Sequence, residues 1–314
     1  MLYREIENPR GIANAFFNLA TLARERNDFV QALSLYATAL NLERTLGTKR
    51  DKAVVLLGMG IVAVYQSDYP HAEELLNECL GLFQELGDAT SVATSLDALG
   101  EAARDQGNYA RAAQLHRQAF NTFRELGEAW AMAKSLCNLG AVAQAQGNYE
   151  QASANYEQAL ALFREGRHRR EIAMTLDYMG TLARDQGNCA RAAELHEEGL
   201  TLYRALKDRR GIATALFNLG VVAYLLAEYA RAVDLFSESL ALRREMGLKL
   251  GIAQCMEGLG AVACAQGNAE RAAQLLSEAG NSREAIGAPL LGHGSYERII
   301  AEMRANLSRE MAFH

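Results

Sequence analysis

Apolar residues recur at three- and four-residue steps along most of this chain, in runs separated by short breaks. In one stretch Ile212, Leu216 and Leu219 share one face of a helix, and after a break Ala232 and Phe236 share a face of another. This spacing is typical of amphipathic α-helices, and no segment shows the strict alternation of a half-buried strand. The hydrophobic pattern therefore predicts an all-α protein built from pairs of helices.

The pair of helices recurs every 40 residues in one unbroken register. We number the positions of each 40-residue block as columns 1–40. Columns 3, 13 and 22 hold Ala in all seven blocks, and column 10 holds Gly in six of them. A fixed period of this length predicts a solenoid, in which each unit buries its apolar face against its neighbours. The predicted repeats are 11–50, 51–90, 91–130, 131–170, 171–210, 211–250 and 251–290.

The break inside each block carries residues that end one helix and begin another. Four blocks have Gly-Asn at this point, at 107–108, 147–148, 187–188 and 267–268. Gly adopts the left-handed conformation that closes a helix, and Asn accepts hydrogen bonds from the free amides that open the next one. Asp28 and Asp68 replace Asn in the first two blocks. We expect the first helix over about columns 1–16 and the second over about columns 19–36.

Small residues at columns 10, 13, 22 and 29 predict a close approach of the two helices within a block. A Gly inside a helix costs about 1 kcal/mol relative to Ala. Gly at column 10 in six blocks therefore indicates a packing requirement, and we expect a larger side chain there to overpack the contact.

The order of these columns resembles the tetratricopeptide repeat, whose motif places a large residue, Leu-Gly, Ala, an aromatic residue and Ala at fixed spacings. One block carries this motif as Leu216, Leu219-Gly220, Ala223, Ala232, Phe236 and Ser239. Another carries it as Leu96, Leu99-Gly100, Ala103, Ala112, His116 and Ala119. Two features depart from the family pattern. Each unit is six residues longer than the common 34-residue repeat, and Arg replaces the usual Pro near the end of the second helix.

The resemblance implies a right-handed superhelical solenoid of helix-turn-helix hairpins, with a concave groove lined by the first helices. Repeats of this longer kind are similar to those of bacterial multidomain transcriptional regulators and of signal-transduction NTPases. They are also similar to those of kinesin light chains and of peptide-sensing regulators of Gram-positive bacteria. Such arrays serve many unrelated tasks, so the resemblance specifies the fold and leaves the ligand open.

Both ends of the chain depart from a full repeat. Residues 1–10 match the last ten columns, so we expect the chain to begin within the second helix of a truncated unit. Residues 291–314 are expected to hold a truncated capping helix, with Ile299, Ile300, Met303 and Leu307 on one side. We interpret the chain as an array excised from a longer protein. The alternative is that its short first helix is a natural cap.

Composition narrows the class of partner. The apolar fraction of 50% and the charged fraction of 22% are those of soluble globular proteins, and no stretch approaches the ~20 apolar residues of a membrane span. The net charge of −6 argues against nucleic acid as a partner. Five cysteines without CxxC spacing indicate small buried residues in the reducing cytosol, and we expect no metal or cofactor.

Catalytic motifs are absent from the sequence, which contains no HExxH, no nucleophile elbow and no Walker-type loop. His116 and His196 occupy one column, which holds Tyr, Leu or Phe in the other blocks, so we interpret them as partly buried packing residues. A solenoid also lacks the closed, dry pocket that catalysis uses. We therefore expect that this segment is not an enzyme.

The candidate site is the groove that the resemblance implies, with columns 4, 7, 8, 11, 14 and 15 at its exposed positions. Column 8 holds Asn18, Asn138 and Asn218. An Asn amide carries both a donor and an acceptor, so it is able to pair with a peptide backbone in either direction. The alternative is that these amides are solvated or bonded to their own helices.

Two blocks add charged residues to this candidate groove. Column 7 holds Asp97 and Asp177, and column 14 holds Arg104 and Arg184, each followed by another Asp. The functional interpretation is a polar clamp for a carboxylate or a charged peptide side chain. The alternative, which the sequence favours, is ion pairing within and between repeats, with Arg near the carboxyl end of a helix.

Apolar and aromatic residues complete the candidate groove. Leu57 and Tyr65 belong to the second block, Tyr178 to the fifth, and Phe217 and Tyr224 to the sixth. Apolar patches on a soluble inner surface suggest a partner. The alternative is that curvature buries these side chains against the next repeat.

These observations predict a module that binds a peptide or a protein segment. We expect it to be the sensor, regulatory or scaffold region of a larger bacterial signalling protein in the cytoplasm, acting on a fused effector domain. Two other hypotheses remain open. The array recruits substrates for an enzyme whose catalytic domain lies outside this segment, or it is an oligomerisation scaffold that stacks through exposed apolar ends. Neither nucleic acid nor a membrane is expected as a partner.

Overall fold

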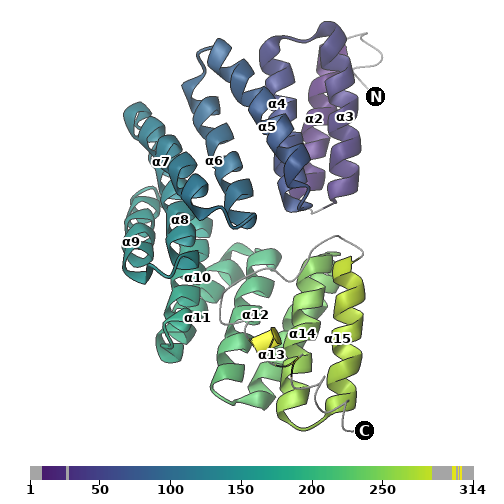
Figure 1. Ribbon diagram of the computed structural model, residues 1–314, viewed down its shortest axis with the longest axis vertical. Coiled ribbons are helices and arrows are strands. Elements are labelled where there is room, and N and C mark those ends of the chain that lie inside the picture. Colours follow the sequence, from purple (N-terminus) through teal and green to yellow (C-terminus); the bar gives the residue numbers. More distant parts are fainter. Residues whose placement is uncertain (1–8, 26–27, 285–298, 302, 304, 306–314) are drawn as a thin grey trace. The chain divides into compact units, whose positions relative to one another are not determined.

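The computed structural model of the chain describes residues 9–25, 28–284, 299–301, 303 and 305 (Figure 1). Every secondary-structure element in this part of the chain is an α-helix, and it contains no strand. The predicted all-α class, with helices in tandem pairs, is confirmed. The prediction that residues 1–10 end the second helix of a truncated unit is wrong for Pro9 and Arg10, which begin the helix Pro9–Glu25. Residues 1–8 and Leu307 lie outside the described residues.

The first helix of each pair begins two residues before the predicted block, and these starts are 40 residues apart. These helices are α2 (Pro9–Glu25), α4 (Lys49–Tyr65), α6 (Ala89–Asp105), α8 (Ala129–Ala145), α10 (Arg169–Asp185), α12 (Arg209–Leu225) and α14 (Lys249–Ala265). We call them the A helices. They begin earlier than predicted because they have caps of their own, among them a capping box of Thr48 and Asp51 at α4.

The second helix of each pair begins at the predicted column 19. These helices, which we call the B helices, are α3 (Phe29–Leu46), α5 (Tyr69–Glu85), α7 (Tyr109–Leu126), α9 (Tyr149–Glu165), α11 (Cys189–Leu206), α13 (Tyr229–Glu245) and α15 (Ala269–Glu284). Their predicted span is confirmed to within a residue at α3, α5, α7, α9, α11 and α13.

The predicted chemistry of the break between A and B helices is confirmed. Gly107 and Gly187 have φ angles of 78° and 80°, in the left-handed region that favours glycine. Asn108 and Asn188 then accept a hydrogen bond from the backbone amide three residues further on. Asp28 does the same for Gln31 in the first hairpin.

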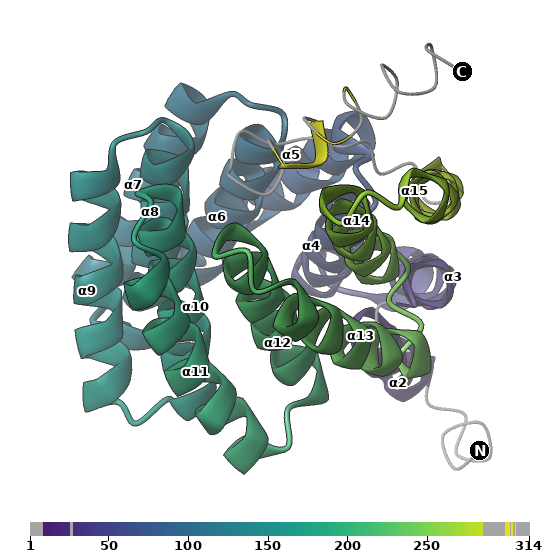
Figure 2. The same ribbon diagram turned by 90° about the horizontal axis from the view of Figure 1, so that it is seen from below.

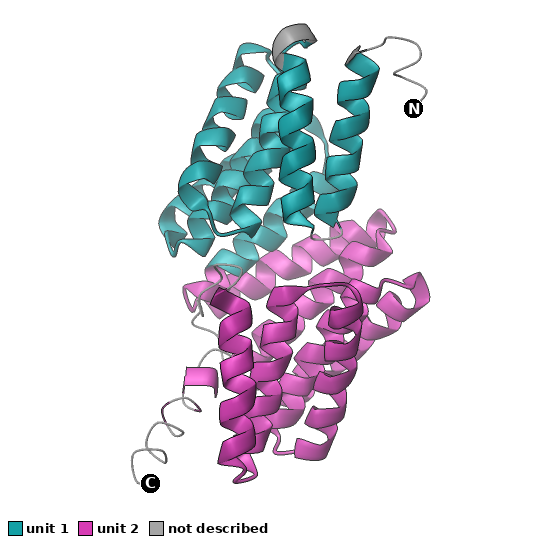
Figure 3. Cartoon of the chain, turned by 90° about the vertical axis from the view of Figure 1, so that its right-hand side faces the viewer, with its two compact units in different colours: residues 1–142 teal, residues 143–314 magenta. Residues whose placement is uncertain are grey.

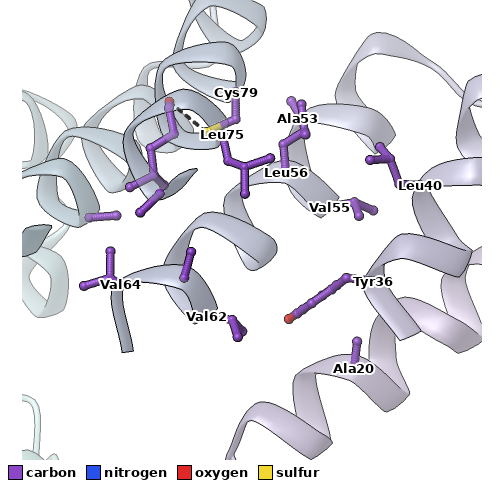
Figure 4. Packing of buried hydrophobic residues seen from close by; sticks show 14 of the residues in the cluster. Ala20, Tyr36, Leu40, Ala53, Val55, Leu56, Val62, Val64, Leu75 and Cys79 are labelled. Atoms are coloured by element: carbon purple, nitrogen blue, oxygen red, sulfur yellow. Dashed lines mark hydrogen bonds between the residues drawn. The ribbon is translucent and has the colours of Figure 1, made fainter. Parts of the chain in front are cut away.

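The small residues of column 10 allow the two helices of a hairpin to touch. A Cβ atom added at Gly60 would lie 2.7 Å from Cγ of Leu76, and one added at Gly220 would lie 2.7 Å from Cδ1 of Phe236. Column 10 therefore packs directly on column 26 of the same hairpin, as the prediction of a close contact requires. Figure 4 shows this interior in the first two hairpins, where Tyr36 of α3 points between α2 and α4.

The chain divides into two compact units, residues 1–142 and residues 143–314, and the division falls within α8 (Figure 3). Each unit is built in the same way. A B helix packs against its own A helix and against the A helix that follows, as α3 does with α2 and α4, and as α13 does with α12 and α14. Figures 1 and 2 show these hairpins lying side by side within each unit.

The described residues of the predicted capping helix belong to the core of the second unit. Ile299, Ile300 and Met303 are buried and join the apolar cluster that includes Met256 of α14 and Leu275 of α15. Figures 1 and 2 both show this short segment beside α14. Three of the four apolar residues predicted to share one side of the helix therefore do lie in an interior.

Candidate functional site

Column 7 is buried in the third to seventh repeats, and its side chain meets that of column 26 across the A–B contact in the first, third, fifth and sixth repeats. In the third repeat Oδ1 of Asp97 lies 2.8 Å from Nδ1 of His116, and in the fifth Oδ1 of Asp177 lies 2.8 Å from Nδ1 of His196. Both His side chains are completely buried. The two carboxylates therefore hold the buried imidazole rings of their own hairpins.

Side chains at column 33, in the last turns of the B helix, also contact the column-7 side chains. In the seventh repeat Arg283 holds Glu257, the residue at column 7, with two hydrogen bonds of 2.8 Å. In the sixth repeat the guanidinium of Arg243 lies 4.8 Å from the ring centroid of Phe217. Columns 7, 26 and 33 thus form one interior cluster, and its chemistry changes from repeat to repeat.

The expectation that column 7 lies on an accessible groove is wrong for three of its residues. Asp97, Asp177 and Phe217 are only 9%, 5% and 6% exposed, because they pack into the A–B contact of their own hairpins. Leu57 is half-buried and packs against the core of the first unit. The varied chemistry of this column reflects its partners within the protein.

The arginines of column 14 pair with their own neighbours. Arg104 contacts Asp105 at 2.9 Å, and Arg184 contacts Asp185 at 3.2 Å. Arg184 is itself buried, and Gln144 donates a further hydrogen bond of 2.8 Å to Asp185. The structure thus brings each Arg together with the Asp that follows it, which is the pairing that the sequence favours.

Accessible side chains of the A helices gather at columns 4, 8 and 15, and we call these positions the A-helix face of each unit. Asn18 and Tyr65 are exposed, whereas Asn138, Tyr178 and Asn218 are half-buried. Column 4 adds Lys134 and Gln254, which were not among the predicted site residues although they lie one helical turn before column 8. The face is polar with aromatic members.

The aromatic members of the candidate site are held by rings beneath or beside them. Tyr178 stacks on Tyr156 with ring centroids 5.7 Å apart, and Tyr65 stacks on Phe29 at 5.6 Å. Tyr224, at column 14, has Tyr229 at 6.0 Å. Such packing restricts the rings, so a ligand that contacts them loses less side-chain entropy on binding.

Burial also shifts the pKa values of two acidic side chains in the interior. Burial raises the pKa of the Glu43 carboxyl, and the Asp51 carboxylate raises it further. Burial raises the pKa of the Tyr203 phenol, and so does the Asp177 carboxylate nearby. Neither group belongs to the A-helix face, so these shifts describe the packing of columns 7 and 33.

A small hollow in the second unit is lined by residues of α9, α10 and α11. Its volume is about 280 Å³, and its lining includes Leu160, Leu176 and Met179 with Arg164 and Glu198. Arg164 and Glu198 contact each other at 3.6 Å across it. An ion pair thus spans the hollow.

The described residues contain no group of three or more His, Cys, Asp or Glu side chains placed to hold a metal ion. None of their helices is long and apolar enough to cross a membrane.

The chain belongs to the tetratricopeptide repeat family. The family model matches residues 11–85, 51–125, 131–205, 171–245 and 211–285, which together span most of the sequence. The family is one of protein-interaction modules, and the resemblance stated from the motif columns is confirmed. No curated protein sequence matches the chain.

Solved structures share the fold at low sequence identity. A Rap protein complexed with competence and sporulation factor has 14% identity and a TM-score of 0.74, over 87% of this chain and 74% of that one. The Rap conjugation gene regulator of plasmid pLS20, in complex with the Phr* peptide, has 17% identity and a TM-score of 0.68, over 87% and 73%. A signal transduction ATPase with a tetratricopeptide repeat sensor from Pyrococcus horikoshii has 14% identity and a TM-score of 0.60, over 94% and 44%.

Proposed function

We propose that the A-helix face of one or both units binds an extended peptide or a flexible protein segment. The observation that carries the proposal is the set of accessible or half-buried side chains at column 8, Asn18 and Asn138 in the first unit and Tyr178 and Asn218 in the second, set on a buried framework of repeats. Membership of an interaction-module family supports it. Two structures with this fold hold ligands, competence and sporulation factor in one and the Phr* peptide in the other, and the second supports this class of ligand.

The chemistry of the face indicates what kind of segment it takes. Asn138 and Asn218 offer hydrogen bonds to a peptide backbone, and Tyr178 offers a ring for a ligand side chain. Arg104 and Arg184 are already paired with carboxylates of their own chain. We therefore infer a neutral, partly apolar segment as the ligand, in place of the acidic side chains that an arginine clamp would select.

The cellular role that fits this ligand is regulation. The ATPase from Pyrococcus horikoshii carries its repeats as a sensor, and we propose that the present array is likewise a cytoplasmic sensor or scaffold of a signalling protein, coupled to an effector. The second hypothesis is that the array recruits substrates to an enzyme. The two roles share one binding face and differ in what the bound segment controls.

A matched set of variants tests the binding face. Linear peptides are selected from a random phage-displayed library on the immobilised full chain, and their affinities are measured by calorimetry. Asn138→Ala and Asn218→Ala remove the column-8 amides, whereas Gln118→Ala and Gln158→Ala change exposed B-helix residues of the same two units. We expect about a 3- to 12-fold loss for at least one Asn variant, the equivalent of one hydrogen bond. Losses only with the Gln variants would reject the A-helix face.

Self-association is a second candidate, because the first repeat presents apolar residues that other repeats bury. Leu19 and Leu22 are 51% and 50% exposed. Column 12 is buried in each of the six later repeats, and later A helices such as α4 and α12 pack on the preceding B helix at α3 and α11. A second copy of the chain would cover the same columns through a two-fold interface.

Sedimentation equilibrium over a range of concentrations tests this second candidate. The parent chain should dimerise, and the double change Leu19→Glu with Leu22→Lys should give a monomer with an unchanged helix signal in circular dichroism. A parent chain that sediments as a monomer at all concentrations would reject the two-fold interface.

A further inference from the structure

The Asn residues of column 8 follow His residues in the preceding repeat. Column 26 holds His116 and His196, and the next column-8 residues along the array are Asn138 and Asn218. Where column 26 holds Tyr, Leu or Phe, the next column-8 residue is Gly58, Ala98, Tyr178 or Gly258. Both amides that have a preceding repeat therefore stand after an imidazole.

The structure shows that these two columns touch across successive repeats. A Cβ atom added at Gly58 would lie 2.7 Å from Cζ of Tyr36, and one added at Gly258 would lie 2.8 Å from Cζ of Phe236. The stacked rings of Tyr178 and Tyr156 are the third example. By the equivalence of the repeats, Asn138 faces His116 and Asn218 faces His196.

Several polar atoms of these His and Asn residues are buried without partners. Nδ1 of His116 is bonded to Asp97, whose other oxygen accepts a hydrogen bond of 2.7 Å from Ser135. Nε2 of His116 is buried without a partner, and so is Nδ2 of Asn138. In the second unit, Nε2 of His196 is likewise buried without a hydrogen-bond partner. Buried polar atoms are rarely left unbonded, so each of them calls for a partner.

We propose that the buried Asp–His pairs orient the Asn amides of the A-helix face. In a neutral imidazole whose Nδ1–H donates to a carboxylate, Nε2 carries the lone pair and is an acceptor. Nδ2 of Asn138 then donates to Nε2 of His116, which satisfies both atoms at once. Asn218 has the same relation to His196. His116 and His196 are positioning residues and make no contact with a ligand.

The orientation decides what the face offers to a ligand. With Nδ2 turned inward to the imidazole, Oδ1 of each Asn remains as an acceptor on the A-helix face. A freely rotating amide accepts or donates with equal ease, whereas a fixed one selects a donor. The ligand would therefore present backbone N–H groups to Asn138 and Asn218. This consequence rests on the proposed function, whereas the orientation itself does not.

Nuclear magnetic resonance tests the orientation without any ligand. The full chain is labelled with ¹⁵N at histidine, and long-range proton–nitrogen spectra are recorded at neutral pH. In each ring the imidazole proton should lie on Nδ1, and Nε2 should carry the lone pair. Asn138→Ala should move the Nε2 resonance of His116 and leave that of His196 in place, and Asn218→Ala should do the reverse. A proton on Nε2 of either ring, or resonances that ignore these substitutions, would overturn the proposal.

A repacked variant separates the orientation from the binding face. The triple change Asp97→Phe, His116→Phe and Asn138→Gly copies Phe217, Phe236 and Gly258 of later repeats, so its fold should persist. Selected peptides that require Asn138 are compared with versions methylated at single backbone nitrogens. Methylation at one backbone nitrogen should lower the affinity for the parent chain about tenfold, and the triple variant should bind the methylated and unmethylated peptides equally.

Peptides that need Asn138 but tolerate every methylation would overturn the acceptor role while leaving the proposed function intact. Failure to select any peptide would count against the proposed function, and the histidine spectra would still decide the orientation.

Discussion

Glu257 of α14 and Arg283 of α15 form a buried ion pair, in which Nε and one terminal nitrogen of the arginine each lie 2.8 Å from a carboxylate oxygen. The Glu257 side chain is completely buried. The equivalent positions hold Asp177 and Tyr203 in the fifth repeat, and Leu57 and Phe83 in the second. The same interior place is therefore filled by an ion pair, a polar pair and an apolar pair in one molecule.

Breaking this ion pair should destabilise the protein strongly. Glu257→Leu leaves a buried guanidinium without its partner, which costs about 3–5 kcal/mol of unfolding free energy. The double change Glu257→Leu with Arg283→Phe copies Leu57 and Phe83, and should recover most of that loss because an apolar pair replaces the buried charges. Urea unfolding of the three proteins measures both effects. A double variant no more stable than the single one would show that the seventh repeat cannot accept apolar packing at this place.

A serine at position 215 should stabilise the fifth repeat. Oδ2 of Asp177 is buried without a hydrogen-bond partner, whereas the equivalent oxygen of Asp97 accepts from Ser135. Ala215 occupies the position equivalent to Ser135, so Ala215→Ser supplies the missing donor and should add about 0.5–1.5 kcal/mol. Thermal unfolding measures the gain. An Ala215→Ser variant that is no more stable than the parent would contradict the explanation.

Two glycines of one hairpin should respond to alanine in opposite directions. Gly60→Ala places a Cβ 2.7 Å from Leu76, so overpacking of about 1–3 kcal/mol exceeds the gain in helix propensity. Gly81 of α5 has no atom within 4 Å of the added Cβ, and Gly81→Ala should stabilise by about 0.5–1 kcal/mol. Denaturant midpoints of the two variants test the difference. Stabilisation by both would mean that column 10 is not a close contact.

The cysteines should divide into two classes by reactivity. Burial raises the pKa of the Cys79 thiol from 9.0 to about 11, so at pH 8 only about a thousandth of it is thiolate. Burial also raises the pKa of Cys255. Cys189 and Cys264 are half-buried. In the folded protein an aromatic disulfide reagent at pH 8 should modify Cys189 and Cys264 long before Cys79 and Cys255.

The raised pKa of Cys79 also predicts a pH dependence of stability. The folded-state pKa lies above that of the unfolded thiol, so the neutral form is favoured by folding. Its contribution to unfolding free energy is complete below about pH 9 and disappears as the pH rises towards 11. Cys79→Ala should flatten the alkaline decline in urea-unfolding free energy. An unchanged decline would place its origin in other groups.

The fold follows from the sequence because its signals are local and repeated. Each of the four Gly-Asn breaks carries the residues that end one helix and begin the next, and all seven blocks keep one 40-residue register. The start of the A helices was predicted about two residues late, because caps such as Thr48 and Asp88 belong to the preceding block and differ in each copy.

The candidate site follows from the sequence only in part. The residue type at column 7 differs between repeats, as is usual for an exposed position, yet the column lies in the interior. Each change at column 7 is accompanied by a change in the residue that it contacts at column 26 or column 33. Asp97 and His116 are 19 residues apart, as are Asp177 and His196, and Glu257 is 26 residues from Arg283. These spacings could have been used to predict the Asp–His and Glu–Arg pairs from the sequence. The resemblance did place columns 4 and 8 among the exposed positions, but the sequence did not show that Gly58, Ala98 and Gly258 of column 8 are buried, because that depends on how closely successive repeats approach.

Amide shift mapping with a selected peptide tests the central claim most directly. The ¹⁵N-labelled chain is titrated with unlabelled peptide, and the shifted amides are placed on the A and B helices. The shifts should concentrate at columns 4 and 8 of one unit, around Lys134 and Asn138 in the first or Asn218 and Gln254 in the second. The amide resonances of exposed B-helix residues such as Gln118 and Gln158 should not shift. Shifts confined to the B helices, with columns 4 and 8 unmoved, would contradict it.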